Sequence, residues 1–160
     1  MYLFFIVLAA VGLMVQISGH ANTGGKQMEA RGAFQVKITP AQSTAFEKEM
    51  AVGRHQIDKT WVGDFAGMSK GEMLSSYTES TGSMAYVAME QMTGKLGGKS
   101  GSFYLAHRAT MTKGDAASGE MNIAVVKGSG TEELAGLTGE LTIIIDAAGK
   151  HSYVFEYKLP

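Results

Sequence analysis

Apolar and polar residues alternate with a period of two along much of the chain beyond residue 27, and this alternation restricts the folds open to it. The pattern is clear over residues 28–38, where one face carries Ala30, Gly32, Phe34, Val36 and Ile38. Successive side chains of a β-strand point to opposite faces of a sheet, so such a segment has one buried face and one face in water. The chain is therefore predicted to be built from half-buried strands.

The same reasoning predicts eight strands, separated by turns rich in glycine. Their ranges are 28–38, 53–65, 69–77, 83–93, 100–112, 120–126, 140–146 and 152–159. The 21 glycines and two prolines suit a sheet protein with tight turns. A short helix near residues 46–50 and one helical turn over 131–137, with Thr131 as its N-cap, are too short for crossover connections. We expect an all-β fold, an antiparallel closed barrel of about eight strands.

An apolar segment precedes the predicted barrel. Residues 1–15 are apolar or glycine apart from Tyr2, and the small residues Gly19 and Ala21 suit cleavage by a signal peptidase after Ala21. We predict a signal peptide over 1–21, a linker over 22–27 and the barrel domain over 28–160, hence an exported protein, periplasmic or secreted. The alternatives are a membrane anchor formed by residues 1–21 and an incorrectly assigned start of the gene.

The composition argues against several classes of function. With no cysteine, the chain has neither disulfides nor thiolate sites. The 14 basic and 15 acidic residues are interspersed, and without a basic stripe we expect no nucleic-acid partner. His55 and Asp58 would point to opposite faces of a strand, so no metal site and no cofactor are predicted. The glycines of residues 128–130 lack the Gly-Lys-Ser/Thr ending of a phosphate-binding loop.

Five residues within the strands are candidates for binding a ligand inside the barrel. They are Glu72, Tyr86, Glu90, Phe103 and His107. Two carboxylates and a histidine converging in the lumen would be buried, and burial would raise the pKa of the carboxyl groups enough for acid–base work. The alternative is a solvated outer face, which is the usual place for a strand's charged residues. For Glu72 this alternative has support, because Lys70 shares its face.

Four segments of the chain together resemble a known family. They are residues 30–37 (ARGAFQVK), 70–74 (KGEML), 128–139 (GSGTEELAGLTG) and 155–160 (FEYKLP). The family is an uncharacterised bacterial domain of unknown function whose members resemble the eight-stranded barrel of allene oxide cyclases, and the resemblance covers residues 28–160. The glycine-rich segment is also similar to a turn of allene oxide cyclases and dirigent proteins. The resemblance implies a fold and assigns no catalytic residue.

Three functions are open at this stage. A barrel of this size has room for one small ligand, so the first is the binding of an apolar or amphipathic small molecule, assisted by the many methionines. The second is an isomerase or cyclase resembling allene oxide cyclase, whose cavity would restrict the shape of a reactive ligand. The third is a filled barrel that forms homo-oligomers through an outer face, for instance around Ile144 or Val154. Whether the protein is an enzyme is left undecided.

Overall fold

The computed structural model describes residues 26–160, with the side chains of residues 116–118 left out. The predicted signal peptide or anchor over 1–21, and residues 22–25 of the predicted linker, lie outside the described part of the chain. The first strand begins at Met28. No helix within residues 26–160 has the length and apolar character needed to cross a membrane.

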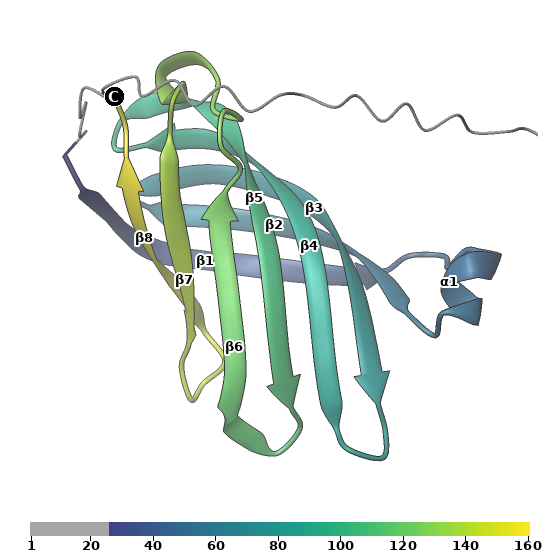
Figure 1. Cartoon of the computed structure of the whole chain (residues 1–160). Coiled ribbons are helices and arrows are strands. Elements are labelled where there is room, and N and C mark those ends of the chain that lie inside the picture. Colours follow the sequence, from purple (N-terminus) through teal and green to yellow (C-terminus); the bar gives the residue numbers. More distant parts are fainter. Residues whose placement is uncertain (1–25) are drawn as a thin grey trace, which may run out of the picture.

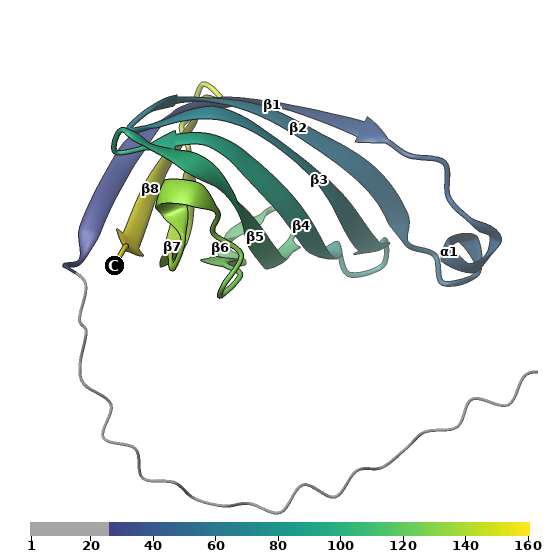
Figure 2. The same ribbon diagram turned by 90° about the horizontal axis from the view of Figure 1, so that it is seen from above.

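Eight antiparallel strands close into one barrel, as predicted (Figures 1 and 2). Each strand pairs with the next along the chain, and β8 pairs with β1. The elements are β1 (Met28–Pro40), α1 (Ala45–Glu49), β2 (Gly53–Gly63), β3 (Phe65–Thr78), β4 (Ser83–Leu96), β5 (Lys99–Thr112), β6 (Asp115–Val125), η1 (Glu132–Leu134), β7 (Thr138–Ile145) and β8 (His151–Lys158). Closure removes the free edges that an open sheet would expose.

The predicted second strand is interrupted near its end, which corrects the range 53–65. β2 stops at Gly63, and β3 starts at Phe65. Gly63 has a φ of 111°, a value that favours glycine. The Asp64 carboxylate accepts a 2.8 Å hydrogen bond from the Arg31 amide, and the Asp64 amide donates to the Arg31 carbonyl. A tight turn held against β1 therefore replaces the end of the predicted strand.

The helical segments also differ in detail from the prediction. Thr44 caps α1 with a reciprocal bond to Glu47, a pairing typical of helix starts. The turn over Glu132–Leu134 is a 3₁₀ turn, and Thr131 makes no side-chain cap there. Its hydroxyl instead accepts a 2.9 Å hydrogen bond from the Ser102 amide on β5. Thr131 thus ties the turn to the barrel wall.

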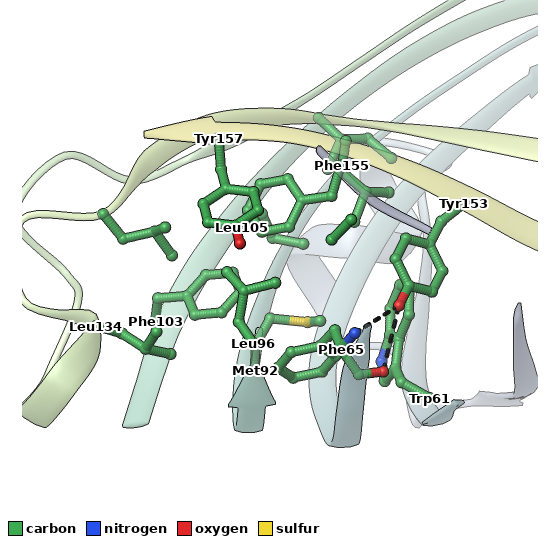
Figure 3. Close-up of a cluster of buried hydrophobic side chains, with 14 of the residues drawn as sticks. Trp61, Phe65, Met92, Leu96, Phe103, Leu105, Leu134, Tyr153, Phe155 and Tyr157 are labelled. Atoms are coloured by element: carbon green, nitrogen blue, oxygen red, sulfur yellow. Dashed lines mark hydrogen bonds between the residues drawn. The ribbon is translucent and has the colours of Figure 1, made fainter. Parts of the chain in front are cut away.

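The packed part of the core is rich in aromatic rings (Figure 3). Rings from β2, β3, β5 and β8 meet edge-on or stacked, with Trp61 and Tyr153 5.2 Å apart and Phe103 and Phe155 5.8 Å apart between ring centroids. The Tyr153 hydroxyl accepts a 2.8 Å hydrogen bond from the Phe65 amide, so its polar atom is satisfied inside the core. Leu134 of η1 is fully buried against this cluster.

Each strand has an inner face in the core and an outer face in solvent, and two neighbouring aromatic residues of β5 test this assignment. Phe103 is 1% exposed, whereas Tyr104 is 39% exposed on the outer face. We expect Phe103→Ala to lower the free energy of unfolding by about 3–5 kcal/mol, because it empties a packed site. Tyr104→Ala is the matched control and should change it by about 0.5 kcal/mol or less. Equal losses in urea unfolding would contradict the assignment of faces.

Candidate functional site

A carboxylate is completely buried in the middle of the barrel. Glu90 of β4 has no exposed surface, and charged or polar groups from three other strands surround it. Lys59 Nζ of β2 donates a 2.8 Å hydrogen bond to Glu90 Oε2, and the Ser69 hydroxyl of β3 donates to Oε1. His107 Nε2 of β5 lies 3.1 Å from Oε2, at an angle outside that of a hydrogen bond. We call these four residues the charge cluster.

The register of the sheet accounts for this convergence. Lys59 pairs with Ser69 between β2 and β3, Gly71 with Glu90 between β3 and β4, and Ala88 with His107 between β4 and β5. The four side chains therefore lie on a diagonal across adjacent strands, all on the inner face. Four strands that are consecutive along the chain thus build the site.

The charge cluster is joined to the aromatic core. Trp61 Nε1 donates a 2.8 Å hydrogen bond to Ser69 Oγ, the same hydroxyl that donates to Glu90. Lys59 Nζ lies 5.0 Å from the ring centre of Phe34 and 5.1 Å from that of Trp61. Such cation–π contacts stabilise an ammonium group that has lost water. The charge cluster is therefore supported on one side by packed rings.

The charge cluster keeps Glu90 ionised. Burial by itself raises the pKa of Glu90, but the close His107 contact, the positive charge of Lys59 and the hydrogen bonds from Lys59 and Ser69 together lower that pKa from 4.5 to about 2. The expected rise in the pKa of a buried carboxyl group is therefore wrong for Glu90. Burial, followed by the nearby charge of Glu90, raises the pKa of the Tyr86 hydroxyl. At neutral pH the site holds a carboxylate and a neutral phenol.

The five candidate residues do not all lie together. Glu90 and His107 meet in the charge cluster, and Tyr86 shares the inner face of β4 with Glu90. Phe103 is part of the packed aromatic core. Glu72 lies on the outer face, with a side chain that is 56% exposed and 3.9 Å from Arg54. The expectation that two carboxylates converge in the lumen is therefore wrong, and the solvated outer face holds for Glu72.

Sequence reasoning missed three members of this arrangement, Lys59, Ser69 and Trp61. The alternation of His55, Ile57, Lys59 and Trp61 was visible, but a lysine and a histidine on one face obscured which face is inner. A lysine in step with an isoleucine and the single tryptophan was the available signal. His55 and Asp58 do point to opposite faces, and Asp58 pairs with Lys70 outside. No group of three or more potential metal ligands occurs within residues 26–160.

Beyond the charge cluster, the inner face changes character. The strand register aligns Tyr77, Met84 and Met111 in one row, and Tyr86, Ala109 and Met121 in the next. Tyr77 and Met121 are 50% and 46% exposed although they belong to the inner face, whereas inner residues of the aromatic core are almost fully buried. These partly exposed inner side chains lie at the end of the barrel with the β3–β4 and β5–β6 hairpins, away from the C-terminus (Figure 1). We call this end of the barrel the methionine end.

The pairing between neighbouring strands is also sparsest between β6 and β7, near the methionine end. Among the described residues, the register between β6 and β7 pairs Ala124 with Glu140 and no others. From that pair towards the β5–β6 hairpin, no further pair of described residues joins the two strands. Ile145 of β7 continues the inner-face alternation of Leu141 and Ile143 on this stretch, and it is 58% exposed.

Comparison with known proteins places the chain in a family. Residues 30–157 match the model of a family described as "Protein of unknown function (DUF3224)". The chain belongs to the DUF3224 family. This confirms the resemblance to a family of unknown function, and it assigns no role to the charge cluster.

One solved structure supports the fold of this DUF3224 protein. It is the crystal structure of a protein with unknown function from the DUF3224 family from Shewanella oneidensis MR-1. The two chains are 40% identical, with a TM-score of 0.75, and the match covers 84% of this chain and 98% of the other. No similar protein was found among the curated proteins. The likeness to allene oxide cyclase stays a prediction.

The lowered pKa of Glu90 predicts how stability depends on pH. A carboxyl group with a lower pKa in the folded state stabilises the protein above its unfolded pKa and loses this contribution as pH falls. As pH falls from about 5 to about 2, the contribution of Glu90 to the free energy of unfolding should therefore decrease by up to about 3 kcal/mol. Urea unfolding across this range should show a shallower acid loss for Glu90→Gln than for the parent. If the free energies of unfolding of the two proteins fall in parallel with pH, the lowered pKa of Glu90 is contradicted.

The ion pair itself can be tested with a double variant. Lys59→Met leaves Glu90 buried without its main positive partner and should lower the free energy of unfolding by about 3–5 kcal/mol. Adding Glu90→Met removes the stranded charge, so the double variant should recover a large part of that loss. Losses that simply add would show that the two side chains do not stabilise each other.

Proposed function

We propose that this DUF3224 barrel binds an apolar or amphipathic small molecule at the methionine end, with the polar part of the ligand towards the charge cluster. The observation that carries the proposal is the row of inward-facing apolar side chains that stay exposed there, including Met121 at 46% and Ile145 at 58%. Apolar surface facing water favours a ligand that covers it. Residues on the inner face of a barrel surround such a ligand from several strands.

The kinds of side chain at this end suit a ligand of adaptable shape. Methionine has a flexible, polarisable side chain that packs against varied apolar surfaces. Met73, Met84, Met111 and Met121 come from four consecutive strands and share the inner face. Among the described residues, β6 and β7 share a single ladder pair, so a ligand would enter most readily by separating these two strands.

The charge cluster gives one end of the proposed site its polarity. Lys59 Nζ is a hydrogen-bond donor beside Glu90, and His107 Nε2 lies 3.1 Å from Glu90 with no hydrogen bond to any described residue. Tyr86 stands on β4 two inward positions before Glu90 and keeps its proton because burial raises its pKa. These donors favour a ligand whose polar group accepts hydrogen bonds. The proposal concerns binding, since the Glu90 carboxylate is already held by its partners.

A dansyl-labelled fatty acid tests the proposed site. Met121→Lys places a charge on the inner face of the methionine end, and we expect it to weaken binding of the probe by about tenfold or more. Met68→Lys is the matched control, because Met68 is a 65% exposed methionine on the outer face of β3. Fluorescence titration measures both affinities.

Two results would contradict the proposal. One is a probe that does not bind the parent protein, and the other is equal binding by both lysine variants. Native mass spectrometry of the protein purified from its own host adds an independent measurement. A small-molecule mass that is lost on denaturation supports the proposal and identifies the ligand.

A further inference from the structure

The outer face of β3, β4 and β5 carries an apolar patch. Leu74, Val87 and Met89 are 41%, 53% and 51% exposed there, and Ala106 of β5 lies beside Met89. The patch forms the floor of a shallow groove of about 500 Å³, bordered by Arg54 and by Glu47 of α1. We call Leu74, Val87, Met89 and Ala106 the outer patch.

Charges of opposite sign flank the outer patch. The register aligns Leu74, Val87 and Arg108 in one row, and Glu72, Met89 and Ala106 in the next. Glu72 therefore lies on the β3 side, and Arg108 on the β5 side. Glu72 is 56% exposed with only a 3.9 Å contact to Arg54, and Arg108 takes part in none of the ion pairs among the described residues.

We propose that the outer patch binds a second copy of this chain across a two-fold axis that runs along β4. Such a rotation places β3 of one subunit over β5 of the other and keeps the rows aligned. Val87 and Met89 then meet their own copies at the centre. Glu72 then lies over Ala106 of the partner subunit, one row from Arg108 of the partner subunit, and symmetry repeats this diagonal pair on the other side.

The arrangement of charges favours a copy of the chain over a different protein. The β3 side carries two acids and one base, Glu47, Glu72 and Arg54, and the β5 side carries the base Arg108. A net negative side and a positive side flanking one apolar strip are complementary to the same surface turned by 180°. A surface of a single sign would instead call for a partner of opposite charge. The apolar centre supplies the area removed from water, while the two ion pairs at the rim fix the orientation. This inference is independent of the ligand site on the inner face.

Exchanging the charges between two variants tests the proposed dimer. Analytical ultracentrifugation of the full chain should show a monomer–dimer equilibrium. Arg108→Glu brings two acids together in each pair, and Glu72→Arg brings two bases together, so each variant alone should dimerise about tenfold more weakly. An equimolar mixture should form heterodimers at close to the parent's affinity, because both pairs are again of opposite sign.

Two further variants separate this interface from other causes of association. Met89→Asp should abolish the dimer, whereas Ile144→Asp changes a 46% exposed outer residue of β7 and should leave it intact. Circular dichroism melts check that every variant is folded. A parent that stays monomeric, or folded charge variants that fail to associate on mixing, would overturn the proposal. So would equal effects of Met89→Asp and Ile144→Asp.

Discussion

The buried carboxylate of Glu90 sets the conditions that the rest of the barrel must meet. A charge with no exposed surface loses its hydration, and that loss is large unless partners replace the water. Lys59, Ser69 and His107 supply those partners from three other strands. A register slip of one residue in β4 would turn Glu90 to the outside and leave Lys59 buried alone. An incorrect register in any of these four strands would therefore leave a buried charge without its partner, which is unfavourable.

The charge cluster also divides the interior into two parts with different properties. On one side, rings of β2, β3, β5 and β8 pack closely, and Leu134 of η1 is buried with them. On the other side, inner methionines and tyrosines stay partly exposed. Packed rings hold Lys59 in place through Phe34 and Trp61. The packed half therefore supports the charge cluster, whose four members are all buried, and the partly exposed inner side chains lie on its other side.

Much of the fold could be predicted from the sequence because alternation in a strand is a local property. The faces of β1, β5 and β8 follow from residues two apart, and eight such strands without long helices favour a barrel. The second strand was predicted to run to residue 65, past its end at Gly63, because the position of the turn depends on the contact of Asp64 with Arg31 on another strand. Thr131 is the N-cap residue of η1 as predicted, but its side chain makes no cap hydrogen bond there, because the hydroxyl accepts a hydrogen bond from Ser102 on β5 instead.

The candidate site was harder to predict, because it depends on the register between strands. Glu90 and His107 were identified, but nothing local places Lys59 of β2 against Glu90 of β4. The pKa of Glu90 was expected to rise with burial, and the sign changes only once Lys59 and His107 are in contact. Glu72 and Glu90 looked alike in sequence, and the pairing of Glu72 with Met89 rather than with Glu90 separates their faces.

Strand β4 brings the two proposed surfaces within one residue of each other. Ala88 and Glu90 point inward, while Val87 and Met89 point outward into the outer patch. A change in the backbone of this strand would therefore affect both surfaces, whereas a change in a single side chain affects one. If a subunit bound at the outer patch holds β3, β4 and β5 together, opening for a ligand falls to the weakly paired β6–β7 boundary. Association outside and ligand entry inside then use different strands of the same barrel.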